Sequence, residues 1–329
     1  MRALVTGSNG FVGSSLIRHL LADPGQRVVA VQRHSKPTPH PVGVETLQID
    51  ALDAHTDWRP VLAQVDAVVH LAARVHVMRD DATDPLAEFR RVNVDGSLQL
   101  ARQAAQAGVR RFVYVSSIKV NGEHTLPGQP FAATDTPQPR DAYGISKHEA
   151  ELGLRRLADS SGMELVIVRP PLVYGPGVRA NFRSMMQWLT RGIPLPFGAI
   201  HNQRSLVALD NLCDLIAVCT RHPDAPGGTF LAGDGEDVST TQLLRRLGTA
   251  LGYPARLIGV PPAALSAFFS LAGKADVSRR LFNSLQVDIG EARTRLGWRP
   301  PIGLDEGLRR AAAAFLGESG AAPAARSEQ

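Results

Sequence analysis

The sequence predicts an α/β fold, with a doubly wound parallel sheet followed by a smaller, mixed α/β domain. Three observations predict it. Short apolar segments alternate with helical patterns through the first half of the chain. These segments are apolar almost throughout, as strands buried on both faces are. A glycine-rich turn joins the first of them to the first helical pattern, as in nucleotide-binding sheets.

The elements follow one another in a regular order. Apolar runs predict strands at Ala3–Val5, Arg27–Gln32, Thr46–Ile49, Ala67–Leu71, Phe112–Val115 and Leu165–Val168. Apolar residues every three to four positions predict helices at Phe11–Leu21, Trp58–Gln64, Leu86–Ala107 and Ala142–Ala158. Alternation of this kind is Rossmann-like, because each helix returns the chain to start the next parallel strand.

The pattern loosens after Arg169, where paired prolines and Gly175-Pro176-Gly177 indicate loops. Leu206–Thr220 then has the pattern of a strand end and a helix that returns to the sheet. We therefore divide the chain into a Rossmann domain at 1–170 with a return segment at about 205–222, a substrate-binding domain at 171–204 and 223–316, and a disordered tail at 317–329.

Composition excludes several classes of protein. The chain has 329 residues, a hydrophobic fraction of 44% and a formal net charge of +5, which fit a globular protein and not a disordered one. The basic residues are dispersed and not interleaved with aromatic ones, so we expect no nucleic-acid partner. Only four of the 36 basic residues are lysine, so a lysine carries more information here than an arginine.

Two cysteines, the N-terminal residues and one long uncharged segment indicate whether the chain binds a metal, where it is located and whether it enters a membrane. Cys213 and Cys219 have neither a metal-ligand spacing nor a disulfide pattern, so we expect two buried thiols and no metal. The N-terminus lacks the layout of a signal peptide, which predicts a cytoplasmic location. Leu257–Gly273 contains Pro261-Pro262 and is short for a span, so we expect no stable membrane insertion.

The turn from Gly7 to Gly13 has the spacing of a dinucleotide-binding loop. Glycines at Gly7, Gly10 and Gly13 permit a tight turn, close approach of backbone to a pyrophosphate, and close packing of helix on strand. The N-terminus of the following helix then faces the phosphates. We therefore expect a dinucleotide cofactor at this turn.

The residues at the end of the second strand indicate which nicotinamide dinucleotide the chain prefers. An acidic residue there accepts the ribose hydroxyls of NAD, but this chain has Gln32-Arg33. No carboxylate repels a 2′-phosphate and Arg33 can pair with one, so we expect NADP(H) in preference to NAD(H), with NAD(H) as the alternative. Asp50, after the third strand, is either an acceptor for an adenine amino group or a turn former.

Ser117, Tyr143 and Lys147 form the predicted catalytic set. The four-residue spacing puts Tyr143 and Lys147 on one face of a helix, and Ser117 ends the fifth strand. A lysine ammonium near a phenol stabilises the phenolate and lowers its pKa by about one to a few units. The phenol can then exchange a proton with a substrate carbonyl or alcohol, while Ser117 hydrogen-bonds the same oxygen.

These motifs, with His70-Leu71-Ala72-Ala73, Asn93 and the segment Arg169–Gly177, resemble the extended short-chain dehydrogenase/reductases, also called the NAD-dependent epimerase/dehydratase family. The resemblance runs to about Leu316. It implies an NAD(P)-binding domain, a UDP-sugar substrate and a homodimer. It also implies that Tyr143 is the general acid/base, that Lys147 binds the nicotinamide ribose as well, and that Ser117 orients the reacting oxygen.

The resemblance assigns further contacts by position. Those with the cofactor are Gly7, Gly10, Phe11, Val12, Gly13, Gln32, Arg33, Asp50, Ala51, Leu71, Ala72, Ala73, Asn93, Pro170 and Leu172. Asn181 and Arg204 match positions that hold the substrate diphosphate, and Arg204 is otherwise a solvated arginine. Lys119 is expected near the sugar or a phosphate, or else is a surface lysine.

The residues that follow Ser117 distinguish among the reactions that members of the family catalyse. Sugar 4,6-dehydratases of the family carry Asp-Glu where this chain has Ile118-Lys119, so the acid and base for dehydration are missing. Epimerases carry a tyrosine where this chain has Asn121. The stretches Ser116–Glu123 and His70–Met78 are similar to a bacterial subgroup that is often called UDP-glucose 4-epimerase, although its better-studied members are similar to 4-ketosugar reductases.

Three functions follow from this resemblance. The leading one is reduction of the C4 ketone of a UDP-4-keto-6-deoxy-N-acetylhexosamine, giving UDP-N-acetylquinovosamine for surface polysaccharides such as O-antigen. The second is a UDP-hexose 4-epimerase acting on UDP-glucose or UDP-N-acetylglucosamine. The third is a non-catalytic NADP(H)-binding regulator, which the intact set of Ser117, Tyr143 and Lys147 disfavours because a sensor needs no acid/base pair.

Overall fold

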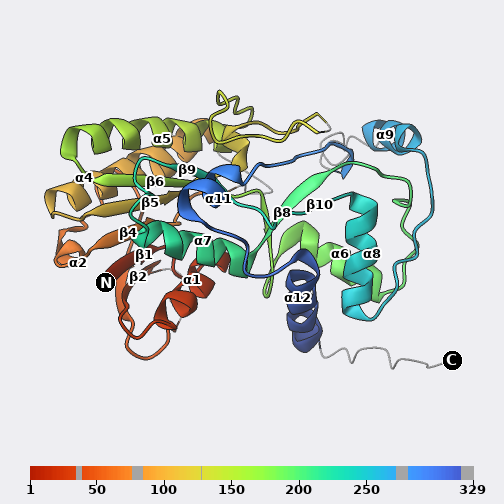
Figure 1. Ribbon diagram of the computed structural model, residues 1–329, viewed down its shortest axis with the longest axis horizontal. Coiled ribbons are helices and arrows are strands. Elements are labelled where there is room, and N and C mark those ends of the chain that lie inside the picture. The colour runs from red at the N-terminus through yellow and green to blue at the C-terminus, as the bar shows by residue number, and fades with distance from the viewer. Residues whose placement is uncertain (35–38, 76–83, 127, 272–280, 320–329) are drawn as a thin grey trace.

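The computed structural model describes residues 1–34, 39–75, 84–126, 128–271 and 281–319 (Figure 1). Within them, a seven-stranded sheet has the order β3-β2-β1-β4-β5-β6-β9, and all neighbouring strands are parallel. Its strands are β1 (Arg2–Thr6), β2 (Arg27–Arg33), β3 (Glu45–Ile49), β4 (Ala67–His70), β5 (Arg111–Val115), β6 (Glu164–Arg169) and β9 (Thr229–Leu231). The predicted doubly wound parallel sheet is confirmed.

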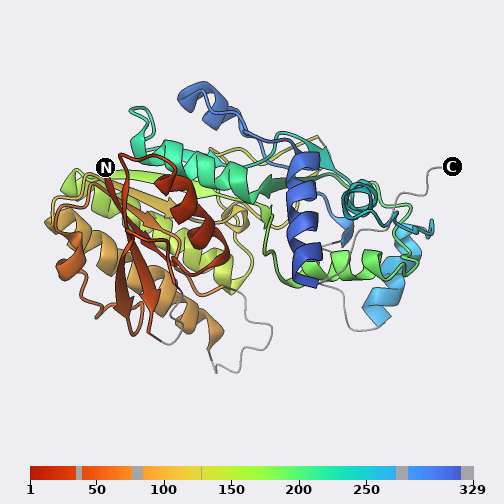
Figure 2. The same cartoon turned by 90° about the horizontal axis from the view of Figure 1, so that it is seen from below.

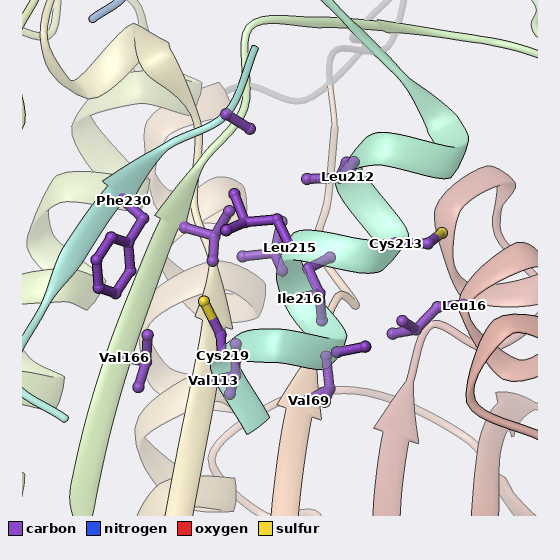
Figure 3. Close-up of a cluster of buried hydrophobic side chains, with 14 of the residues drawn as sticks. Leu16, Val69, Val113, Val166, Leu212, Cys213, Leu215, Ile216, Cys219 and Phe230 are labelled. Carbon is purple, nitrogen blue, oxygen red and sulfur yellow. The ribbon is translucent and has the colours of Figure 1, made fainter. Parts of the chain in front are cut away.

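Helices cover both faces of this sheet, which explains why its strands are apolar on both sides (Figure 2). One face packs against α2 (Arg59–Leu62), α4 (Ser97–Gln106) and α5 (Ala142–Ser161). The other packs against α1 (Phe11–Leu21), α7 (Leu209–Arg221) and α11 (Gly290–Leu296). Figure 3 shows α7 directing apolar side chains onto the strands, and both cysteines are buried free thiols there, as predicted.

The smaller part has its own core. A three-stranded sheet, β10-β8-β7, packs with helices around a separate apolar cluster. Its elements are β7 (Leu172–Tyr174), α6 (Ala180–Thr190), β8 (Arg204–Ala208), β10 (Asp237–Val238), α8 (Thr240–Leu251), α9 (Pro262–Leu271) and α12 (Leu304–Ser319). β7 and β8 are parallel and β10 is antiparallel to β8, so the sheet is mixed, as predicted.

The predicted return of the chain to the large sheet differs in detail. The helix α7 does cover that sheet, but the strand before it, β8, belongs to the small one. β9 pairs with β6, although residues 223–316 were assigned to the substrate-binding part. A strand of three residues carries too little periodicity to be recognised, and only pairing reveals it.

One helix prediction and the predicted start of the tail are corrected. The helix predicted at Leu86–Ala107 consists of α3 (Pro85–Arg90), a π-helical segment η1 (Arg91–Gly96) and α4. π-Helical turns of this kind are frequent at functional sites. The tail was predicted from residue 317, but α12 continues to Ser319, and residues 320–329 lie outside the described part of the chain.

Candidate active site

The glycine turn is shaped by close backbone contacts. Gly7 has a φ of +67°, and a Cβ there would lie 2.9 Å from the amide nitrogen of Ala72. A Cβ on Gly13 would overlap the Gly7 carbonyl oxygen. α1 starts at Phe11 with Gly10 as its N-cap, so no side chain caps the helix. Only glycine allows the backbone to pack this closely, and the tight turn together with the uncapped helix N-terminus fits a cofactor pyrophosphate.

The end of β2 presents Gln32 and Arg33 at the same edge of the sheet as the glycine turn. Gln32 is buried and Arg33 is exposed. Asp50 points to solvent, with 95% of its side chain exposed, and its carboxylate lies 3.9 Å from the imidazole of His34. Arg33 is therefore accessible to an anionic group, whereas Asp50 lies in solvent with its carboxylate near His34.

A buried hydrogen-bond chain holds the loop after β4. The backbone N–H groups of Leu71 and Ala72 donate to Thr6 Oγ1, which lies 2.7 Å from His70 Nδ1. Because Thr6 Oγ1 already accepts from the loop, it donates to Nδ1, and the His70 proton sits on Nε2, 2.8 Å from Ser97 Oγ. Burial and then Lys147 lower the pKa of His70 to about 3, so the ring is neutral.

Asn93 lies in the π-helical segment and braces the same loop. Its Oδ1 accepts from the Arg74 N–H at 2.8 Å, and its Nδ2 donates to the Arg74 carbonyl and to Ser146 Oγ, both at 3.0 Å. Both amide hydrogens are used within the protein, so Asn93 acts on the predicted cofactor edge by positioning backbone. Residues 76–78 of the run that supported the resemblance lie outside the described residues.

Ser117 comes shortly after β5 and Tyr143 lies in the first turn of α5, two elements that are labelled in Figure 1. Ser117 caps the short helix η2 (Ile118–Val120), and it acts on Tyr143 by lowering the pKa of the phenol. Burial and then the Asp141 carboxylate raise the pKa of Tyr143 to about 12, and Ser117 opposes both effects. The phenol therefore holds its proton at neutral pH.

Lys147 lies one helical turn after Tyr143, and its ammonium is buried. Nζ donates to the Val115 carbonyl at 2.8 Å and lies 4.3 Å from the ring centroid of Tyr114. Burial lowers the pKa of Lys147 to about 7, and the Glu151 carboxylate opposes that effect. The predicted lowering of the Tyr143 pKa is wrong for this arrangement, because burial outweighs any help that Lys147 gives.

Lys119 pairs with a protein carboxylate beside the predicted catalytic set. Its Nζ contacts Asp141 Oδ2, and Asp141 also accepts the Gly144 N–H at 2.7 Å as the N-cap of α5. The two side chains are 31% and 30% exposed. Sequence reasoning missed Asp141, although an aspartate directly before a helix is a recognisable cap signal.

The predicted substrate residues lie on the smaller part of the chain. Asn181 is exposed at the start of α6, and Arg204 at the start of β8 donates from Nη1 to the Asn283 carbonyl at 3.1 Å. Pro170 accepts the Ile118 N–H through its carbonyl, and Leu172 is 46% exposed. Along the stretches that the structure describes, no helix has the length and apolarity needed to cross a bilayer.

A glycine cradle at the edge of a Rossmann-type sheet, with serine, tyrosine and lysine from β5 and α5, defines an NAD-dependent enzyme of the short-chain dehydrogenase/reductase type. Residues 3–233 match the model of the NAD dependent epimerase/dehydratase family. The chain belongs to this family.

Sequence and fold comparisons with known proteins give the same family. The chain is 46% identical over 314 residues to a UDP-glucose 4-epimerase of Vibrio cholerae, which covers 95% of each chain. Its fold is similar to the UDP-glucose 4-epimerase of Thermotoga maritima with UDP-glucose, with a TM-score of 0.79, 24% identity and coverage of 97% and 100%. The Thermus thermophilus UDP-glucose 4-epimerase with NAD gives a TM-score of 0.77 at 24% identity, covering 96% and 99%.

Proposed function

We propose that the protein is a UDP-hexose 4-epimerase, which inverts the C4 hydroxyl of a UDP-sugar. The observation that carries the proposal is the pairing of Ser117 with Tyr143 beside the buried Lys147. The extensive identity with the Vibrio cholerae protein supports epimerisation over the reduction that the sequence alone favoured. The side chains of Asn181 and Arg204 are proposed to hold the diphosphate.

The residues present fit a nicotinamide cofactor, which when bound takes a hydride from sugar C4 and returns it. Gly7, Gly10 and Gly13 let the backbone of the turn pack closely at the start of α1, where the helix N-terminus would face the pyrophosphate. In its ionised form, Tyr143 takes the proton from the C4 hydroxyl and later gives it back. Ser117 holds the same oxygen, and Lys147 stabilises the ionised phenol while it is charged.

Reduction of a UDP-4-ketosugar is the second proposal. It is favoured by Gln32-Arg33 in place of an acidic residue, which suits NADPH, and by Asn121. An epimerase keeps its nicotinamide and needs none added, whereas a reductase consumes it. The Arg33→Ser variant tests the predicted preference for NADP(H). If Arg33 pairs with the 2′-phosphate, this substitution should reduce kcat/KM with NADPH and leave kcat/KM with NADH unchanged.

The deciding experiment uses the purified full chain. UDP-glucose and UDP-N-acetylglucosamine are incubated without added cofactor and the C4 epimers are measured, while NADPH oxidation is followed with UDP- and dTDP-4-ketosugars. Tyr143→Phe should lower turnover by about 100-fold or more while leaving cofactor affinity close to wild type. NADPH-dependent ketosugar reduction without epimerisation would replace the first proposal by the second.

Assembly and cellular role belong to the same proposal. We propose a homodimer that works in the cytoplasm and supplies a sugar for surface polysaccharides. Light scattering of the purified chain tests the dimer, and loss of O-antigen after gene disruption tests the role. Neither outcome depends on which C4 reaction the enzyme performs.

A further inference from the structure

A buried ion pair lies directly behind Lys147. Arg169, the last residue of β6, donates from Nε to Glu151 Oε1 at 2.9 Å and from Nη2 to Glu151 Oε2 at 2.5 Å. The two side chains are 4% and 2% exposed. Such a bidentate contact is the strongest form of the arginine–carboxylate pair and fixes the carboxylate in place.

Asn121 completes the partners of this guanidinium. Its Oδ1 accepts from Arg169 Nη1 at 2.9 Å, while its Nδ2 donates to the Ala132 carbonyl at 2.9 Å. Each nitrogen of the Arg169 guanidinium therefore has an acceptor, and the pair is held from three elements. The Glu151 carboxylate accepts two charge-assisted hydrogen bonds from one guanidinium.

Glu151 is also the charged group that faces Lys147. It lies one helical turn after Lys147 on α5, and Tyr143 lies one turn before it. From β5 comes Tyr114, whose pKa burial raises well above its usual value, and from β4 comes His70, which is neutral. Among these neighbours, Glu151 alone carries a negative charge at neutral pH, and it opposes the effect of burial on Lys147.

We propose that Glu151, held ionised by Arg169 and Asn121, is a positioning residue that keeps the buried Lys147 protonated. A buried amine without such a partner releases its proton, and a neutral amine does not stabilise the Tyr143 phenolate. The charge assignment is independent of the proposed function, whereas its effect on turnover rests on that function.

The scarcity of lysine makes the assignment measurable. With lysine labelled by 13C at Cε, the protein gives four resonances, which Lys36→Arg, Lys119→Arg and Lys274→Arg assign by elimination. Glu151→Gln should lower the titration midpoint of Lys147 by about one pH unit or more. Glu149→Gln is the matched control, because Glu149 pairs with Arg90 on the exposed side of the same helix.

A double variant tests the proposal if Glu151→Gln does not fold. Glu151→Gln leaves Arg169 buried without its carboxylate, which destabilises folded proteins strongly. Replacing both partners, Glu151→Gln with Arg169→Met, removes both charges, a change that cores often tolerate. The Lys147 midpoint should again fall below that of the wild type. An unchanged midpoint in either folded variant would overturn the proposal.

Kinetics separate this proposal from the proposed function. The basic limb of the kcat/KM profile should move to lower pH in Glu151→Gln, by the same amount as the Lys147 midpoint, with activity kept on the acidic side. A lowered midpoint in a protein that turns over no UDP-sugar leaves the charge assignment standing and refutes the function. Turnover of UDP-sugar with a wild-type midpoint in Glu151→Gln refutes the charge assignment alone.

Discussion

Asp141→Asn is expected to make Tyr143 easier to ionise without disturbing the start of α5. The Asp141 carboxylate accepts the Gly144 N–H, caps the helix, and raises the pKa of Tyr143. Asparagine caps a helix about as well as aspartate does, so the substitution removes the charge and keeps the cap. The pKa of Tyr143 therefore falls, and its phenolate forms at lower pH.

The size of the effect follows from the exposure of the group. Asp141 is 30% exposed and paired with Lys119, and such partly exposed charges interact by at most about 1 kcal/mol. One pKa unit corresponds to about 1.4 kcal/mol, so the pKa of Tyr143 falls by at most about 0.7 units. At a fixed pH below that pKa, the phenolate fraction then rises up to about fivefold.

The assay is the pH dependence of UDP-sugar epimerisation together with urea unfolding. Asp141→Asn should raise the rate at fixed pH within that limit and leave stability nearly unchanged, whereas Asp141→Ala also loses the cap, at about 1 kcal/mol. Lys119→Met exposes Tyr143 to the unpaired carboxylate and should shift the profile to higher pH. A folded Asp141→Asn protein with the wild-type profile would refute this reasoning.

Three further outcomes are expected. Gly13→Ala should abolish cofactor binding in a fluorescence titration, since its Cβ would overlap the Gly7 carbonyl, whereas Gly317→Ala meets no atom within 4 Å and should bind as wild type does. Leu212→Ala should lower the free energy of unfolding by about 2–5 kcal/mol, because Leu212 is fully buried in the cluster of Figure 3; a loss within error contradicts that packing. His70→Gln should flatten the loss of stability between about pH 6.5 and 3: the folded pKa is depressed to about 3, so native stability is complete above the unfolded pKa and lost as pH falls. An unchanged slope in urea titrations across that range argues against a buried neutral imidazole.

The sequence alone determined the fold class. It also determined two features that depend on short spacings, namely the glycine turn and the placement of Tyr143 and Lys147 on one helix. The alternation of apolar strands and helices predicted the large sheet, and the glycine spacing predicted a tight turn, in which Gly7 has a φ of +67°. The four-residue step from Tyr143 to Lys147 predicted one helix, α5. These features are local, because periodicity and turn chemistry are written within a few residues.

Tertiary structure decided what each of those side chains faces. The pKa of Tyr143 rises because of burial and the Asp141 carboxylate. Lys119 forms an ion pair with that aspartate. The ion pair of Glu151 with Arg169 lies behind Lys147. The three residues of β9 became a strand only by pairing with β6. Charge, burial and sheet pairing act through space between residues far apart in the chain, so no pattern within a short window of sequence specifies them.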